Sequence, residues 1–546
     1  MPSTDATGIH DQTNLLPKRE LLIVFGALSF GLLVTFIDQN SIAIALPTIG
    51  RKLGCASTVE WAGTSSMIAN AAFQVLYGRF SDIFGRKVII VGSLVLLAIG
   101  DLLCGFAQTG PQLYAFRGIA GMANGGIMAL SMMIVSDVVT LEERGKYQGI
   151  LGSCVGLGNV IGPFIAAEFT QHASWRYTFY LLCPLALVAA VVLFFKLPPQ
   201  NMPNEHWRVT IAKIDWAGII LASGGTVLLL IPVSGIGSQF PSDSPLVISM
   251  LTLGGVFLIA FIFNEWKVAK LPMIPLRLFQ SPPLAAMLIQ NFLIGIVWYP
   301  ILYFLPVYFQ SARQLSLIKS AALLLPIVIG LSTSSTLSGL YISRMNRYGE
   351  IIWFGFFMWT FMAGLNLLFG RETQVVEIVF ILFLEGLGVG CVFQPILVAA
   401  QAHSTKSDRA VVISARNFIR ALGGAVGLAI TSAIFSNSLH AHLPSHLPQA
   451  VQDAVHRSTF ATPDLTKLDN ATRDHVLDAY ASASKTVSIF FVSGIGGCLA
   501  LMVFIKDRGL QRQEEKEDVE GQPEEAELNP TACGREERLD DKITKA

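Results

Sequence analysis

Fourteen long apolar runs, separated by polar segments, determine what this chain can fold into. A helix needs about 20 mostly apolar residues to cross a bilayer. Hydrophobic residues make up 52% of the chain and charged residues only 14%, whereas roughly a quarter of the residues in soluble domains are charged. The sequence therefore predicts an all-α integral membrane protein with 14 transmembrane helices. We expect these helices near residues 21–46, 58–77, 88–108, 112–136, 147–170, 175–196, 215–235, 245–265, 284–309, 318–340, 351–369, 375–400, 411–436 and 485–505.

The distribution of Lys and Arg predicts which helix ends face the cytosol. An even number of spans places both termini on one side of the membrane. If the N-terminus is inside, the short inner connections carry 15 basic residues and the short outer connections carry six. Since basic residues favour the cytosolic side, we expect both termini to be cytosolic, with tails at residues 1–20 and 506–546. The second tail is dense in charge and is expected to be disordered.

Several features of the early spans recur about 260 to 270 residues later. A Leu-Pro pair at 46–47 is matched at 305–306, and glycine-lined runs occur in the fifth and thirteenth spans. The repeat predicts two six-helix halves, at residues 21–196 and 284–505, joined by a linker at 197–283 that carries two inserted helices. Two related halves are typical of transporters that bind their substrate between the halves, near the middle of the membrane.

A long polar segment at residues 437–484 is expected to be an external loop. It contains the sequon Asn470-Ala471-Thr472, which predicts a glycoprotein if the loop is extracellular. It also contains five histidines, including His440, His442, His446 and His456, but no cysteine or carboxylate cluster completes a ligand set, so we expect no metal. A net charge of zero gives no general attraction to nucleic acid. Since we find no G-x-S-x-G, H-E-x-x-H or P-loop pattern, we expect neither an enzyme nor a primary pump, and no cofactor.

A short charged stretch, Gly78–Lys87, separates the second and third spans. Its two glycines, Gly78 and Gly85, permit a tight reversal, and Asp82, Arg86 and Lys87 require a membrane surface. The pattern G-x-x-x-D-x-x-G-R-K resembles the signature loop of the major facilitator superfamily of secondary transporters. The resemblance implies a gating loop that holds the outward-open state by charge pairing between helix ends.

Further matches resemble the fungal fourteen-span drug:proton antiporters of this superfamily. The segment Phe36-Ile37-Asp38…Ala45-Leu46-Pro47 resembles their first-span signature, and Arg117…Gly121 their fourth-span motif. Gly158, Gly162 and Pro163 resemble the antiporter motif of the fifth span and are candidates for the helix that rocks between states. The chain departs from the pattern at three places, with Ser66 for a tyrosine, Ala120 for a glutamine and Ala166-Ala167 for two glycines.

Four ionisable residues inside the predicted spans are candidates for proton coupling. A carboxylate at a helix centre costs about 2.5–3.5 kcal/mol on insertion scales, so such residues usually have a function. Asp38 is interpreted as a site of proton uptake and release, or as a partner for a cationic substrate. The alternative is a structural ion pair with Arg117, which has Asp101 as a second candidate partner. The resemblance instead implies that Arg117 is a switch that modulates the pKa of Asp38 or Asp101. Glu385 is either a second proton site or a hydrogen-bond partner of a neighbouring helix.

Four further side chains are candidates for the substrate cavity. Asn291 and Trp298 share one face of the ninth span, Tyr299 is adjacent, and Gln394 lies in the twelfth. Such a stripe suits an amphipathic ligand, although aromatic stripes more often pack against other helices. Arg416 and Arg420 share a face of the thirteenth span, and we expect them to extend to the cytosol.

The predicted function is proton-coupled efflux of small amphipathic compounds, such as drugs, toxins or secondary metabolites, by alternating access. The alternative is a vacuolar proton-coupled carrier for basic amino acids or another small solute. We expect a monomer in the plasma membrane, or in the vacuolar membrane under the alternative. Its partners would be its substrate, protons and the lipid bilayer.

Overall fold

The computed structural model describes residues 17–55, 58–59, 61–199, 215–235, 244–269, 273–274, 276–404, 408–443, 470–507 and 509. Its long helices are α1 (Lys18–Lys52), α2 (Trp61–Phe84), α3 (Arg86–Phe106), α4 (Gly110–Val138), α5 (Leu141–His172), α6 (Arg176–Lys196), α8 (Trp216–Gly235), α9 (Pro245–Lys267), α10 (Pro282–Val307), α12 (Leu325–Met345), α13 (Gly349–Leu365), α14 (Val375–Ala402), α15 (Arg409–His442) and α17 (Asn470–Leu501). Short helical segments are η1 (Leu276–Gln280), η2 (Tyr308–Ala312), α11 (Leu317–Ala322), η3 (Asn366–Leu368) and η5 (Met502–Phe504).

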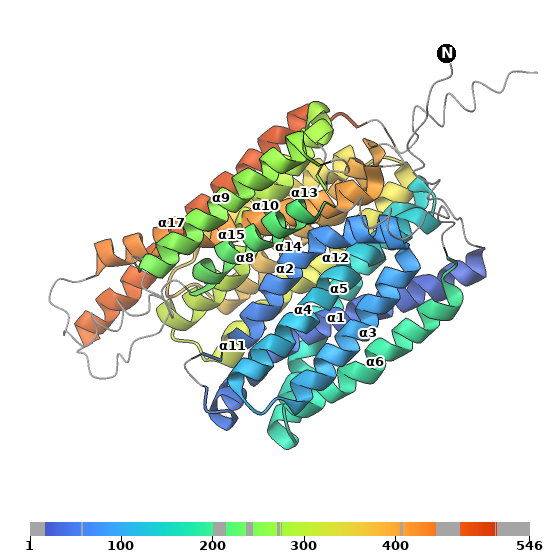
Figure 1. The fold of residues 1–546 in the computed structure, drawn as a ribbon. Coiled ribbons are helices and arrows are strands. Elements are labelled where there is room, and N and C mark those ends of the chain that lie inside the picture. Colours follow the sequence, from blue (N-terminus) through green and yellow to red (C-terminus); the bar gives the residue numbers. More distant parts are fainter. Residues whose placement is uncertain are drawn as a thin grey trace, which may run out of the picture.

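The protein is an all-α integral membrane protein, and its long helices run side by side in one bundle (Figure 1). Thirteen of the described helices are long and apolar enough to cross a membrane. The fourteenth span is α2, which has 24 residues and more polar side chains. The predicted fold class is therefore confirmed.

Two of the expected connections between helices differ from the prediction. The stretch Gly78–Lys87 is not a loop, because α2 continues to Phe84 and α3 starts at Arg86. Only Gly85 breaks the helices, with a φ of 88° that favours glycine. The expected external loop at 437–484 is much shorter, because α15 runs to His442 and α17 starts at Asn470. Hydropathy could not find these ends, since polar residues continue a helix beyond the membrane.

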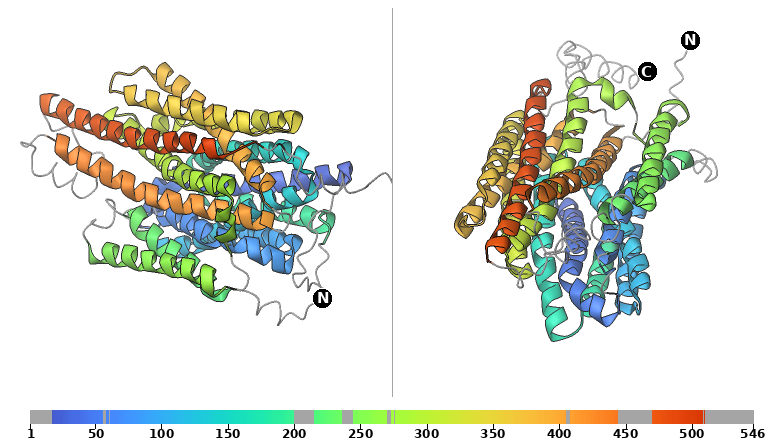
Figure 2. Two further views of the ribbon diagram at one scale, coloured as in Figure 1. Left: turned by 90° about the horizontal axis from the view of Figure 1, so that it is seen from above. Right: turned by 90° about the vertical axis from the view of Figure 1, so that its left-hand side faces the viewer.

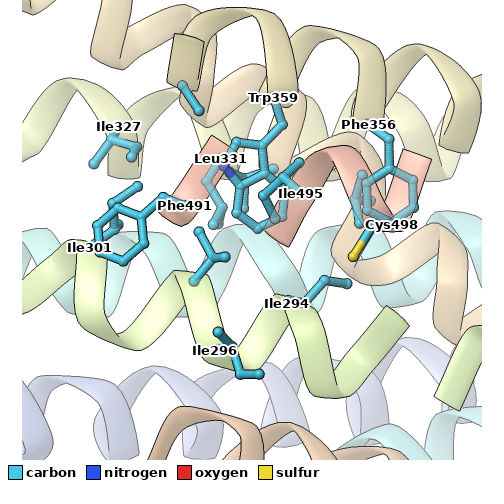
Figure 3. Packing of buried hydrophobic residues seen from close by; sticks show 14 of the residues in the cluster. Ile294, Ile296, Ile301, Ile327, Leu331, Phe356, Trp359, Phe491, Ile495 and Cys498 are labelled. Atoms are coloured by element: carbon cyan, nitrogen blue, oxygen red, sulfur yellow. The ribbon is translucent and has the colours of Figure 1, made fainter. Parts of the chain in front are cut away.

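The helices form two groups, each with its own core. One core joins side chains from residues 21–197 with Leu397 and Ile413, and the other joins side chains from residues 278–505. In the second, α10, α12, α13 and α17 pack around Ile301, Leu331, Trp359 and Ile495 (Figure 3). Because lipid tails are as apolar as these side chains, close packing holds the helices together more than the hydrophobic effect does. We call α1–α6 the N-half and α10–α17 the C-half; the exact boundaries at 196 and 284 stay predictions.

The halves contact each other along two seams. In the first, α5 lies against α12. A Cβ built on Gly149 would lie 2.5 Å from the Ser335 carbonyl oxygen, so only glycine permits this approach. The Ser153 hydroxyl donates to the Ser332 carbonyl at 2.6 Å and also bonds the Thr336 hydroxyl.

In the second seam, α2 lies against α15, and the inserted pair α8–α9 covers it. The Ser223 hydroxyl of α8 donates to the Ala72 carbonyl of α2 at 2.9 Å. On α9, the Phe261 ring meets the Phe418 ring of α15, with centroids 6.0 Å apart. The inserted pair therefore contacts both halves from the rim of the bundle (Figure 2).

Candidate functional site

The N-half holds a buried polar group that we call the acidic cluster: Asp38 of α1, Asp101 of α3, and Arg117 and Asn124 of α4. All four side chains are fully buried. Arg117 forms an ion pair with Oδ1 of Asp38, and the Asn124 amide donates to Oδ2 at 2.8 Å. The sequence named three of these residues, and the structure brings them together.

Asp101 lies close enough to Asp38 and Arg117 to interact with both electrostatically. Neither of its carboxylate oxygens accepts a hydrogen bond from a donor in the described part of the chain. Arg117 also donates to the Ala62 carbonyl at 3.2 Å and lies 5.7 Å from the Phe179 ring centroid. The cluster thus contains two carboxylates and one guanidinium, and a single added proton would make it neutral.

The C-half holds a second buried group, the arginine cluster: Arg416 and Arg420 of α15 with Asn291 of α10 and Phe393 of α14. Arg416 donates to Oδ1 of Asn291 at 3.1 Å and to the Phe393 carbonyl at 2.6 Å. The Arg420 guanidinium lies 5.2 Å from the centroid of the Phe393 ring. Asn291 is 1% exposed and lies behind Arg416, with its amide donated to the Met287 carbonyl at 2.7 Å.

The expectation that these arginines extend to the cytosol is wrong. Arg416 is 4% exposed and Arg420 is 6% exposed. Arg420 stands more than two turns inside α15, because the helix begins at Arg409. The depth of both residues in the helix was visible in the sequence, whereas the helices that cover this face were not.

The remaining cavity candidates lie beside the arginine cluster. The Trp298 ring packs edge-on against Phe393, with centroids 5.3 Å apart, and Tyr299 interacts electrostatically with Arg416. Both residues are half-buried. Gln394 faces the N-half, because a Cβ built on Gly152 of α5 would lie 3.2 Å from its Cγ.

Glu385 is fully buried inside the C-half. Its Oε2 accepts a hydrogen bond from the Asn366 amide at 2.9 Å, and Oε1 has no donor among the described residues. Asn366 belongs to η3, at the end of α13. This contact agrees with the hydrogen-bond alternative for Glu385, and the residue stays a candidate proton site.

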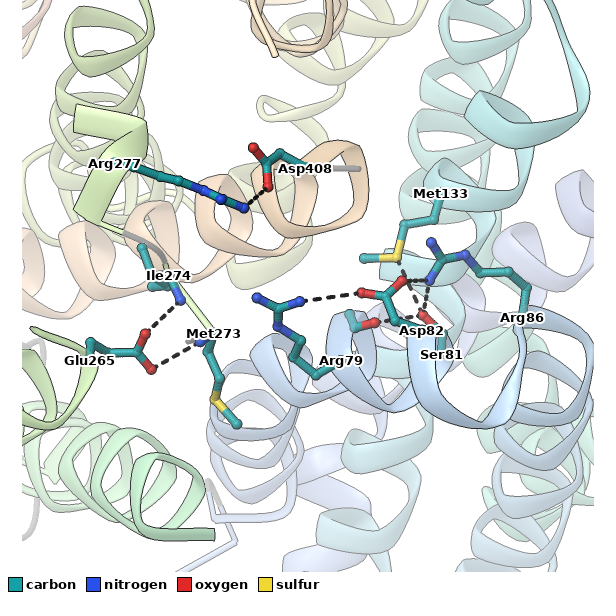
Figure 4. A network of polar contacts seen from close by, with 11 residues as sticks. Arg79, Ser81, Asp82, Arg86, Met133, Glu265, Met273, Ile274, Arg277 and Asp408 are labelled. Atoms are coloured by element: carbon teal, nitrogen blue, oxygen red, sulfur yellow. Dashed lines mark hydrogen bonds and ion pairs between the residues drawn. The ribbon is translucent and has the colours of Figure 1, made fainter. Parts of the chain in front are cut away.

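The predicted gating residues form a network at one end of the bundle, which we call the latch end (Figure 4). Arg86 pairs with Asp82 at 2.8 Å and with Asp137 of α4 at 3.0 Å. Arg79 pairs with Asp82 at 3.9 Å. These ion pairs therefore connect the ends of α2, α3 and α4. Of the other predicted gating residues, Gly78 lies inside α2 and Lys87 lies in the first turn of α3. The sequence did not identify Asp137, which lies 51 positions from Arg86.

Polar contacts next to this network reach the inserted pair and the C-half (Figure 4). The Glu265 carboxylate of α9 accepts the backbone N–H groups of Met273 and Ile274 at 3.1 and 3.0 Å. Arg277 of η1 pairs with Asp408, at the start of α15, at 2.6 Å. The segment after α9 is therefore fixed against the latch end.

The glycines of α5 serve two different faces. Gly158 and Gly162 pack against α1, where built Cβ atoms would lie 2.6 Å from Phe36 Cβ and 2.9 Å from the Ile37 carbonyl oxygen. They lie inside the N-half rather than between the halves, and Pro163 continues the helix beside them.

Asn470 is the first residue of α17, but its side chain lies outside the described residues, as do the loop residues 444–469.

Comparisons with known proteins agree with this architecture. The profile of the Major Facilitator Superfamily matches residues 28–428. Citrate exporter 1 of Yarrowia lipolytica is 50% identical over 509 residues, covering 93% of this chain and 75% of that protein. The MFS-type transporter clz4 of Cochliobolus lunatus is 38% identical, covering 95% and 92%. The efflux pump dotC of Dothistroma septosporum is 32% identical, covering 76% and 71%.

Among solved structures, the human organic anion transporter MFSD10 superimposes with a TM-score of 0.58 at 14% identity, covering 88% of this chain and all of that chain. The proton:xylose symporter XylE gives the same TM-score at 13% identity, covering 92% and 100%. These likenesses concern the fold. Together with the family profile and the fungal relatives, they establish that the chain belongs to the major facilitator superfamily of transporters.

Proposed function

We propose that this chain exports a small organic compound in exchange for protons, by alternating access. The acidic cluster carries the proposal. Two buried carboxylates share one guanidinium, so the cluster gains neutrality when it takes up one proton. A group of this kind can load a proton from one side and release it to the other when access changes.

The contacts between the halves support an outward-facing state. The packing of α5 against α12 involves the first part of α5 and the last part of α12, both near the latch end. Leu397 and Ile413, also near that end, join the core of the N-half. If the latch end is cytosolic, as the basic residues suggest, the halves are closed toward the cytosol.

Two substrate classes have separate support. Polycarboxylates such as citrate are favoured by the relative that shares 50% identity, which is a citrate exporter. Amphipathic drugs or toxins are favoured by the rings of Trp298 and Phe393, and by similarity to efflux pumps. The basic amino acid alternative is disfavoured, because buried arginines would repel a cationic substrate.

Transport by reconstituted full-length protein tests proton coupling. A pH gradient across the liposome membrane should accelerate accumulation of substrate, and a proton ionophore should remove this acceleration. Asp101→Asn should keep exchange of labelled for unlabelled substrate and lose the response to the gradient, because an amide mimics the protonated acid permanently. Equal acceleration in wild type and Asp101→Asn would contradict the proposed role of the cluster.

Localisation needs its own measurement. We propose the plasma membrane, with cytosolic termini and with glycosylation at Asn470. Imaging of a tagged chain distinguishes plasma from vacuolar membrane. Glycosidase digestion of wild type and Asn470→Gln tests the external position of that segment, since only an external asparagine is glycosylated.

A further inference from the structure

We infer that Arg416 and Arg420 form an anion-binding site for the carboxylates of the transported substrate. The inference rests on the proposed transport function and specifies its substrate class. The two arginines lie one helical turn apart on α15 and interact with each other as like charges. Buried like charges repel, so the arrangement requires something to compensate it.

The described residues supply no counter-charge to these two arginines. Within the described ranges, neither guanidinium forms an ion pair. Arg416 binds neutral acceptors only, and Nε of Arg420 is buried without a hydrogen-bond partner. By contrast, the buried Arg86 and Arg117 each pair with an aspartate.

This difference indicates a ligand rather than a structural role. A buried charge that only stabilises the fold is normally paired, because desolvation without a partner costs several kcal/mol. A binding site is different, since its donors must remain available until the ligand arrives. Guanidinium groups suit carboxylates, because each can donate two parallel N–H bonds to one carboxylate.

The position of the arginine cluster fits a transport site. Arg416 donates to the carbonyl of Phe393, and the next residue, Gln394, faces α5 of the N-half. An anion at the arginines would therefore lie beside the interface between the halves, where alternating access requires the substrate. The half-buried ring of Phe393 lies beside Arg420 and against Trp298, so an anion at the arginines would be next to both rings.

Two adjacent guanidiniums favour a ligand with more than one negative charge. Such a ligand compensates both arginines, whereas a monocarboxylate leaves one unpaired. The substrate class that this site would bind is thus a small di- or tricarboxylate. An amphipathic cation would be rejected by the same two charges.

Binding of radiolabelled citrate to the purified full-length chain tests the site. Arg416→Gln and Arg420→Gln should each raise the Kd for citrate about 10-fold or more, because each removes a charge-assisted bond. Lys485→Gln is the matched control, since it removes an exposed basic charge from α17 of the same half and should leave the Kd unchanged. Unlabelled succinate should compete with citrate, and a cationic dye should not.

Thermal stability provides a second readout. Arg420→Gln loses no hydrogen bond to any described residue, so it should fold and should melt at the same temperature as the ligand-free wild type or higher. Citrate should stabilise the wild type and not this variant. Normal citrate affinity in Arg420→Gln would overturn the inference. The inference would also be wrong if Arg420→Gln melted at a lower temperature than the ligand-free wild type and were still stabilised by citrate.

The inference and the proposed function can fail separately. If the wild type binds no polycarboxylate but transports another compound under a proton gradient, only the anion site is wrong. If the arginine variants lose citrate binding but a proton gradient has no effect on transport, only the coupling is wrong.

Discussion

The two halves share a six-helix plan, but the main buried polar cluster of one half has the opposite net charge to that of the other. The acidic cluster of the N-half has two carboxylates and one guanidinium, whereas the arginine cluster of the C-half has two guanidiniums and, among the described residues, no paired acid. Two halves with the same helix plan can therefore bind two different ligands. An acid-rich site suits a proton, and a base-rich site suits an organic anion.

The separation also suggests how the two ligands are coupled. A proton in the N-half and an anion in the C-half lie on opposite sides of the seams, so neither needs to displace the other. Their binding is linked if both favour the same arrangement of the halves. Each of the following changes alters one side of this comparison.

The largest effect is expected from Asp38→Asn, which removes the partner of Arg117. Breaking a buried ion pair from one side costs about 3–5 kcal/mol, and Asp101, which accepts no hydrogen bond from Arg117 among the described residues, would replace the lost pair only in part. Transport should be lost and the melting temperature should fall clearly, as measured by fluorescence-detected thermal unfolding. The double variant Asp38→Asn/Arg117→Gln should regain much of the stability without regaining transport. A stable, active Asp38→Asn protein would show that the acidic cluster is not a paired site.

A smaller effect is expected from Asn291→Ala in the C-half. The amide holds Nε of Arg416 at 3.1 Å, so its loss should let the guanidinium move. The Kd for citrate should rise several-fold, consistent with about 1 kcal/mol for one hydrogen bond. Asn124→Ala is the matched change in the N-half. It should leave citrate binding unchanged and should weaken the response to a pH gradient, and the opposite pattern would reverse our assignment of the two clusters.

The smallest effect on binding is expected from Asp82→Asn at the latch end. Arg86 would keep Asp137 as a partner, so the fold should survive. The rate of transport should fall several-fold while the Kd for substrate stays near that of the wild type, as measured by initial rates and equilibrium binding. In the C-half, Arg344→Gln is a useful comparison. The segment Gly339–Arg347 resembles Gly78–Lys87 at the repeat offset and has no equivalent of Asp82. A larger loss of rate in Arg344→Gln would place the dominant latch in the other half.

The sequence was enough to predict the membrane-spanning helices and the ionisable residues buried within them. The fourteen spans could be placed, because an apolar run long enough to cross a bilayer has few other stable structures. Asp38, Asp101 and Arg117 were found, because an ionisable group deep in a span is costly and therefore rare.

What the sequence could not provide was the neighbours of each side chain. It could not show that Asn124 binds Asp38, or that Asp137 completes the latch, because these contacts join positions 86 and 51 residues apart. Arg416 and Arg420 were misplaced for a related reason. Distance from a helix end suggests exposure only when no other helix covers that face, and here Asn291 and Phe393 cover it.

The inserted pair gives the opening motion a direction. The inserted pair lies along one seam, because α8 contacts both α2 and α15 and the Phe261 ring of α9 meets the Phe418 ring of α15. The seam between α5 and α12 has no such cover in the described structure. When the halves separate at the latch end, the gap should therefore be wide between α5 and α12 and narrow between α2 and α15, where the inserted pair contacts both. A substrate leaving or entering from the cytosol would then pass on the α5 side, where Gln394 stands at the edge.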